Sequence, residues 1–226
     1  MLFFERDRGS DAKRRPRGVR RFEAGVEGME DRRLLTGSGA TILLSGTTIE
    51  VFGSNNGDTG VVAMKNGAVD VSVVNSQGSD DVQFAASQVG AIDYFGGSGN
   101  NHFTNDTSLT GYLYGGSGNN VLTGGSGQDF LFATGSGTNV LNAGSGVETL
   151  EAFGGGTNIL NGGSGSDSML VFAGNNQITG GSGSNFILTF GGQNVVNGGP
   201  GYSTVISFSS TDVIIPNSRE TVIDLY

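Results

Sequence analysis

The sequence predicts an all-β fold, a right-handed parallel β-roll or β-helix in which short strands wind around one narrow core. Two observations lead to this prediction. Glycine accounts for 42 of the 226 residues and proline for only 3, which excludes both collagen and a proline-rich linker. From Gly96 onward the chain also divides into nine-residue units, each a polar turn followed by an apolar strand. Self-similarity at a fixed period is typical of solenoid proteins.

The eighth position of every unit is apolar. The units begin at residues 96, 106, 115, 124, 134, 143, 153, 162, 171, 180, 189, 198, 207 and 216, with single insertions at Asn105, Ala133 and Ala152. Their eighth positions are Phe103, Leu113, Leu122, Leu131, Leu141, Leu150, Leu160, Met169, Ile178, Ile187, Val196, Val205, Ile214 and Ile223. Because only 35% of the chain is hydrophobic, this column is not a chance pattern, and we expect it to form the core.

Composition and charge exclude several classes of function. The chain has no cysteine and a single histidine, which excludes disulfides, thiol chemistry and zinc sites of the usual kind. Residues 1–33 contain 10 basic and 7 acidic residues, whereas residues 34–226 contain 2 basic and 14 acidic residues. The acidic part cannot bind nucleic acid, because phosphate binding depends on Lys and Arg. Its charge favours a cation as partner, or serves solubility alone.

Three segments follow from these patterns. Residues 1–36 are basic and have no periodic apolar face, so we expect a disordered export or sorting segment. Residues 37–95 alternate apolar and polar side chains in runs of irregular length, which predicts an irregular β-strand cap, since terminal repeats are atypical. Residues 96–226 form the regular solenoid. The stretch FEAGVEGMEDRRLLTG resembles a bacterial L-E-x-R-x-L-L sorting signature, with an amphipathic linker as the alternative.

The nonapeptides themselves carry a more specific resemblance. GGSGQDFLF (residues 124–132) and GGSGSDSML (residues 162–170) match G-G-x-G-x-D-x-U-x at every position, where U is large and apolar. This pattern is similar to the RTX nonapeptide of calcium-binding parallel β-rolls. The resemblance implies a six-residue turn and a three-residue strand per unit, two units per coil of about 18 residues, and about seven coils. Ala143 and Pro200 replace glycines of the pattern.

Two units per coil would place alternate sixth positions on the same edge of the solenoid. One edge then carries Asn101, Asn120, Asn139, Asn158, Asn176, Asn194 and Asp212; the other carries Gly111, Asp129, Glu148, Asp167, Asn185, Ser203 and Thr221. We call these the asparagine edge and the acid edge. Stacked amides can bond from coil to coil without an ion, and this is the interpretation we favour for the asparagine edge. On the same edge, Phe153, Phe172, Phe190 and Phe208 recur once per coil and are expected to stack.

The acid edge predicts a calcium site. Carboxylates of Asp129, Glu148 and Asp167 on adjacent coils would lie about 5 Å apart and would repel by roughly 3 kcal/mol per contact at an effective dielectric of 20. Calcium prefers six to eight oxygen ligands, and carbonyls of the glycine-rich turns could complete its shell. The candidate turn residues are Gly124, Gly125, Gly127, Gly162, Gly163 and Gly165. The alternative is that the carboxylates extend into solvent and bind nothing.

No catalytic constellation accompanies these repeats, and His102 falls at an outward position, so we expect no enzymatic activity. The favoured function is an exported bacterial calcium-binding module, structural or adhesive, located outside the cell or on its surface. Its partners would be calcium ions, and either a surface or matrix polysaccharide or a further copy of the chain. One alternative is a metal-free solenoid that assembles through the outward column Val121, Val140, Ile159, Val195 and Val213. The other is an ice- or glycan-binding face formed by Thr104, Thr123, Asn142, Asn161, Thr179 and Asn197.

Overall fold

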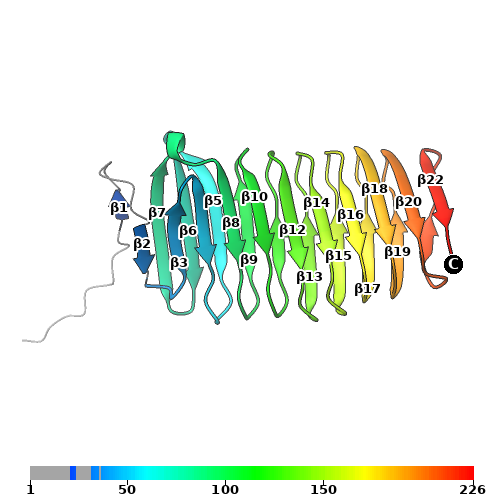
Figure 1. Cartoon of the computed structure of the whole chain (residues 1–226), viewed down its shortest axis with the longest axis horizontal. Helices are drawn as coiled ribbons and strands as arrows, with labels where there is room; N and C mark the ends of the chain where they lie inside the picture. Colours follow the sequence, from blue (N-terminus) through cyan, green and yellow to red (C-terminus); the bar gives the residue numbers. More distant parts are fainter. Residues whose placement is uncertain (1–20, 24–31, 36) are drawn as a thin grey trace, which may run out of the picture.

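A computed structural model describes residues 21–23, 32–35 and 37–226. The strands form two 11-stranded sheets that run the length of an elongated molecule, and beyond the N-terminal cap successive strands alternate between the two sheets (Figure 1). Sheet A contains, in spatial order, β1 (Arg21–Glu23), β7 (Gly78–Ala85), β6 (Ala68–Asn75), β5 (Thr59–Lys65), β9 (His102–Asp106), β11 (Val121–Thr123), β13 (Thr138–Asn142), β15 (Thr157–Asn161), β17 (Asn175–Thr179), β19 (Gln193–Asn197) and β21 (Val213–Ile215). Sheet B contains β2 (Arg32–Leu35), β3 (Thr41–Ser45), β4 (Thr48–Phe52), β8 (Ala91–Phe95), β10 (Thr110–Tyr114), β12 (Asp129–Ala133), β14 (Thr149–Ala152), β16 (Ser168–Val171), β18 (Ser184–Thr189), β20 (Tyr202–Ser207) and β22 (Glu220–Asp224).

The predicted all-β solenoid of stacked parallel coils is confirmed. Equivalent repeat positions lie directly above one another, as in the parallel pairing of β13 with β15, where Asn139 is opposite Asn158 and Leu141 is opposite Leu160. Consecutive coils are offset by 19 residues at this point and by 18 residues from Asn158 to Asn176. The single insertions recognised in the sequence therefore lengthen the early coils without disturbing the register of the strands.

The predicted core column lies between the two sheets. Twelve of its members are fully buried, each with an exposed fraction of 0%: Phe103, Leu113, Leu122, Leu131, Leu141, Leu150, Leu160, Met169, Ile178, Ile187, Val196 and Val205. Burial of one such side chain contributes about 1.5–3 kcal/mol, so the column is the main source of stability along the array. No helix in residues 37–226 combines the length and apolarity that a membrane span requires.

The register predicted for the last coil is wrong by one residue. Val222 lies opposite Val205, where we expected Ile223, and Glu220 lies opposite Ser203, where we expected Thr221. A short turn causes the shift: the Asn217 side chain accepts a hydrogen bond from the Arg219 N–H at 2.7 Å and donates one to the Gly199 carbonyl at 2.8 Å. These contacts close the turn with one residue fewer than the nonapeptide pattern provides.

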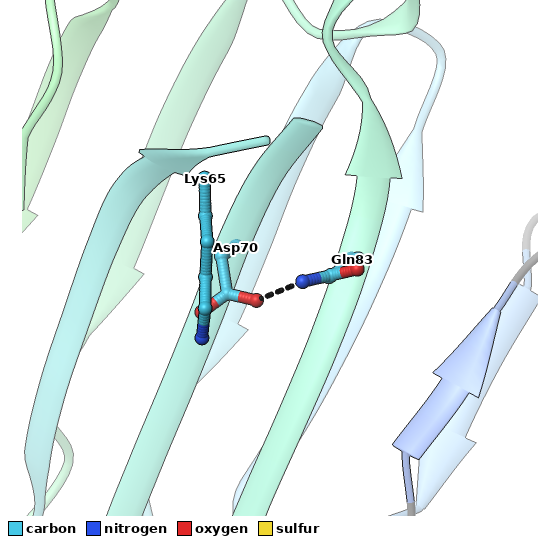
Figure 2. Close-up of polar contacts among 3 residues, drawn as sticks. All are labelled: Lys65, Asp70 and Gln83. Carbon is cyan, nitrogen blue, oxygen red and sulfur yellow. Dashed lines mark hydrogen bonds and ion pairs between the residues drawn. The ribbon is translucent and has the colours of Figure 1, made fainter. Parts of the chain in front are cut away.

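The N-terminal cap differs from the array because its strands are antiparallel. β3 pairs with β4, and β5, β6 and β7 form a meander, before β4 and β5 pair in parallel with the first coil. Figure 2 shows a polar cluster on this meander, in which Gln83 donates to Asp70 at 2.7 Å while Lys65 lies 3.4 Å from the same carboxylate. Burial alone would raise the pKa of Asp70, but these partners leave it lowered.

Two short parts of the basic segment lie within the described residues, and both are strands. Residues 21–23 form β1, which extends sheet A beside β7, and residues 32–35 form β2, which pairs with β3 in sheet B. The edge of each sheet presents unpaired N–H and C=O groups, and an extended segment can satisfy them whatever its side chains. The rest of the predicted sorting signature lies outside the described residues.

Candidate metal centre

The asparagine edge forms a continuous ladder of buried amides. Each Asn side chain donates through Nδ2 to Oδ1 of the next coil, from Asn101 through Asn120, Asn139, Asn158 and Asn176 to Asn194, at distances of 2.7–3.0 Å. These side chains are at most 3% exposed. An amide has both a donor and an acceptor, so a stack of identical amides bonds along its whole length without an ion.

Both ends of the ladder terminate in an aspartate. At the C-terminal end, Asn194 Nδ2 donates to Asp212 Oδ1 at 2.8 Å, and this carboxylate also accepts hydrogen bonds from Thr189 and Ser207. At the other end, the Asp58 N–H donates to Asn101 Oδ1 at 3.0 Å. The side chain at the C-terminal end of the ladder accepts a hydrogen bond from the coil before it and has no further amide to donate to. A carboxylate suits this position, because it only accepts hydrogen bonds. The repeat pattern reveals Asp212 but not Asp58, because Asp58 lies in the irregular cap.

The acid edge is buried as well. Asp129 is 0%, Glu148 1% and Asp167 2% exposed, so the alternative in which these carboxylates extend into solvent is not what the structure contains. They stand at the ends of the turns that lead into β12, β14 and β16, one per coil. Carboxylates are rarely so buried unless they are paired or bound to a metal.

Asp129 has partners within the protein. Its Oδ2 accepts the Gly125 N–H at 2.7 Å, and its Oδ1 accepts Asn105 Nδ2 at 2.8 Å. Burial raises its pKa, while the bonds from Gly125 and Asn105 lower it in part. In the repeat pattern Asn105 is only an insertion between two units. Its buried position in the coil before Asp129 explains why an additional polar residue is accommodated there.

Glu148 and Asp167 are different, because three of their four oxygens have no hydrogen-bond partner among the described residues. The atoms without a partner are Glu148 Oε1 and Oε2 and Asp167 Oδ2, whereas Asp167 Oδ1 accepts the Glu148 N–H at 3.0 Å. Burial and the adjacent Asp167 carboxyl raise the pKa of Glu148 to about 8, and the nearby Gly146 N–H offsets this only in part. Burial also raises the pKa of Asp167. Two carboxyl groups buried this close together either bind a cation between them or share a proton, and the raised pKa of Glu148 reflects this.

The glycines of the acid edge surround these oxygens closely. A Cβ placed on Gly165 would overlap the carbonyl oxygen of Gly146, and one on Gly146 would overlap that of Gly127. The Cβ on Gly146 would also lie 2.5 Å from Glu148 Oε1, and the Cβ on Gly165 would lie 3.2 Å from Glu148 Oε2, so the carboxylate occupies space that only glycine leaves open. A Cβ on Gly162 would likewise lie 2.8 Å from Asp167 Oδ2.

The predicted site residues are therefore brought to one edge but not to one point. In the described part of the chain, no three acidic or histidine side chains are grouped closely enough to hold a metal ion. A cation at Glu148 and Asp167 would need backbone carbonyls and water for its other ligands, as the hard oxygen chemistry of calcium allows. The free buried oxygens and the glycine cradle fit such an ion. Gly124 and Gly125 lie beside Asp129, and Gly163 and Gly165 lie in the turn before Asp167.

The other positions singled out in the sequence lie on the outer face of sheet A. The columns that contain Val121 and Thr123 run side by side along successive strands, in the register the sequence predicts. His102 is exposed at the start of the first column. Within the second column Asn161 Nδ2 donates to Asn142 Oδ1 at 2.8 Å, so this polar row is itself hydrogen-bonded.

Comparison with known proteins supports the interpretation of the repeats. The family model of the RTX calcium-binding nonapeptide repeat matches the chain in 4 copies, over residues 110–135, 154–169 and 170–205. The chain therefore contains RTX-type nonapeptide repeats, and the matched ranges include Asp129 and Asp167 but not Glu148. No curated protein matches the chain, and no solved structure does.

Proposed function

We propose that the protein is a calcium-stabilised β-roll, and that the ion lies between the coils that carry Glu148 and Asp167. The observation on which the proposal rests is the set of three buried carboxylate oxygens without a partner. Buried polar groups in proteins are almost always hydrogen-bonded. Calcium supplies two positive charges and accepts oxygen ligands in flexible geometry, so it would satisfy these oxygens and remove the repulsion between the acids.

Each residue of the acid edge has a distinct role in this proposal. Glu148 would reach across two coils with its longer side chain, while Asp167 would contribute Oδ2 and keep Oδ1 on the Glu148 N–H. Carbonyls of the surrounding glycine-rich turns would add further ligands. Asp129 joins the site only if its oxygens bind the ion in addition to Gly125 and Asn105, so we expect its contribution to be smaller.

Calcium binding would couple folding to the medium outside the cell. A site that the unfolded chain lacks adds its binding energy to the stability of the fold, and weak sites of extracellular modules respond to about 10⁻⁴–10⁻³ M calcium. The proposal that the protein is exported from a bacterium and acts as a structural or adhesive module is supported by the RTX repeats and by the resemblance to a sorting signature. A solenoid stapled by ions also needs no disulfide, in agreement with the absence of cysteine.

Calcium titration calorimetry of two matched variants tests the proposal. Glu148→Gln removes a buried ligand, whereas Glu151→Gln removes the same charge three residues later, on the outer face of sheet B. We expect the wild type and Glu151→Gln to bind calcium with the same stoichiometry, and Glu148→Gln to lose at least one ion. Equal stoichiometry in all three proteins would refute the assignment of the site, and no heat of binding in the wild type would refute calcium binding altogether.

A further inference from the structure

The outer face of sheet B carries an apolar column that calcium binding does not explain. Register places Phe52, Phe95, Tyr114 and Phe132 directly above one another in β4, β8, β10 and β12. Their rings stack with centroids 5.0, 5.3 and 4.6 Å apart and planes within 12° of parallel. Toward the C-terminus the column continues as Glu151, Leu170, Leu188, Ile206 and Ile223.

A second aromatic stack accompanies the aliphatic half of this column. Phe153, Phe172, Phe190 and Phe208 follow two residues after the column positions in their coils, with ring centroids 4.8, 5.0 and 5.2 Å apart. These rings are 38–46% exposed. The predicted stack is confirmed. Its members directly follow the ends of β14, β16, β18 and β20, beside the aliphatic half of the column. We call the column and this stack together the aromatic strip.

The aromatic strip is large for the surface of a monomer. An aromatic side chain has about 150–250 Å² of surface, so rings that are roughly 40% exposed leave about 80 Å² each open to water. Five of the eight rings are this exposed, and the other rings and aliphatic side chains of the strip add less each, so the strip totals roughly 600–700 Å². The largest apolar patch of a typical monomer is about 300–600 Å², and a stable interface buries about 800 Å² per partner.

We propose that the aromatic strip is a dimer interface, in which sheet B of one copy packs face to face on sheet B of a second copy with the solenoid axes antiparallel. Stacked rings expose their edges and not their faces to solvent, because neighbouring coils cover the faces. Such edges suit packing between two sheets, which lie about 10 Å apart. A two-fold axis along the central strands would bring the aromatic half of each copy onto the aliphatic half of the other, as an isologous interface requires.

Charge favours the antiparallel arrangement over the parallel one. Glu50 and Asp93 lie next to the aromatic half of the strip, two residues before Phe52 in β4 and two residues before Phe95 in β8. Arg219 lies near the opposite end, 5.6 Å from the Tyr202 ring, and borders a surface cavity lined also by Thr204 and Thr221. Antiparallel packing separates the acidic ends of the two copies and brings each toward the other copy's arginine, which is complementary.

Glu151 would lie at the centre of this interface. It occupies the middle position of the nine-member column, so the two-fold axis places it opposite Glu151 of the second copy. Two like charges across an interface weaken binding and limit the choice of partner. Glu151 therefore makes the orientation of the dimer testable, because Glu151 of one copy meets Glu151 of the other only if the two-fold axis passes through this coil.

Sedimentation velocity over a range of protein concentrations provides the first test. We expect the wild type to form a dimer, and the double variant Leu170→Lys with Leu188→Lys to remain monomeric while it keeps its β circular dichroism signal. Ile159→Lys, on the outer face of sheet A, is the matched control and should dimerise like the wild type. A wild type that stays monomeric at all concentrations overturns the proposal. So does the opposite pattern of variants, in which Ile159→Lys disrupts the dimer and the Leu170→Lys, Leu188→Lys double variant does not.

Charge exchange and cross-linking test the orientation. A mixture of wild type and Glu151→Lys should associate about tenfold more tightly than either protein alone, because the mixed dimer pairs opposite charges across the axis. Because the chain has no cysteine, a short bifunctional maleimide should cross-link Glu151→Cys to itself. It should also link Asp93→Cys to Thr204→Cys in a mixture, but should not link Asp93→Cys to itself. Efficient self-cross-linking of Asp93→Cys would overturn the antiparallel arrangement.

Discussion

Replacement of Asn158 by alanine tests whether the buried amide ladder stabilises the solenoid. Asn158 accepts the amide of Asn139 at 2.9 Å and donates to Asn176 at 2.7 Å, and its side chain is 0% exposed. Asn158→Ala removes two hydrogen bonds worth about 1 kcal/mol each and leaves a buried donor and a buried acceptor without a partner. We therefore expect the free energy of unfolding to fall by about 3 kcal/mol.

The matched control lies in the same strand. Asn161 also donates to an asparagine one coil away, Asn142, at 2.8 Å, but on the half-buried outer face of sheet A. Water can replace that bond, so Asn161→Ala should cost less than about 1 kcal/mol. Urea melts of both variants, in chelator and in calcium, measure the difference. Equal losses for the two variants, or a loss at Asn158 that depends on calcium, would refute the ladder as an ion-free support.

Three further predictions concern the turns, the core and the buried acids. Gly165→Ala should prevent adjacent coils from stacking and lower the free energy of unfolding by more than about 3 kcal/mol. In the matched variant Gly155→Ala the new Cβ would meet nothing within 4 Å, so this change should be neutral or stabilising by up to about 1 kcal/mol. Thermal melts of the two variants measure the difference. Leu150→Ala should cost about 2–5 kcal/mol, and Leu150→Asp should abolish the cooperative transition in circular dichroism; a wild-type melting point for Leu150→Asp would mean that the register of the core is wrong. In chelator, stability should fall as the pH rises between 4.5 and about 8, because folded Glu148 retains a proton in this window that the unfolded chain has lost. Urea melts across the window should show this fall in the wild type and not in Glu148→Gln.

The fold was predictable because one physical requirement recurs in every coil. A coil has room for one large inward side chain from each sheet, so the apolar eighth position returns unit after unit and defines the register from Phe103 to Val205. The amide ladder was predictable for a related reason, since identical residues stacked one coil apart must be self-complementary. The last coil was mispredicted because the side chain of Asn217 closes a shorter turn, and glycine spacing does not reveal such a contact.

The site was predictable only in outline. Sequence spacing places Asp129, Glu148 and Asp167 on one edge, but it does not distinguish an acid that already has partners from one that has none. That distinction depends on Asn105, a residue outside the nonapeptide pattern, whose amide bonds to Asp129 from the preceding coil. Of the aromatic strip, only the stack of Phe153, Phe172, Phe190 and Phe208 was predicted. The column beside it was not, because it occupies a different repeat position and only the pairing of the strands shows that its members lie above one another.

The most direct test of the calcium proposal is the melting temperature of the wild type with millimolar calcium and with chelator, followed in parallel for Glu148→Gln. Ion binding at the free oxygens of Glu148 and Asp167 predicts a higher melting temperature in calcium for the wild type, with most of the increase lost in the variant. Removal of the buried charge should at the same time leave the variant as stable as the wild type, or more so, in chelator. The same wild-type melting temperature in calcium and in chelator would contradict a calcium-stabilised β-roll.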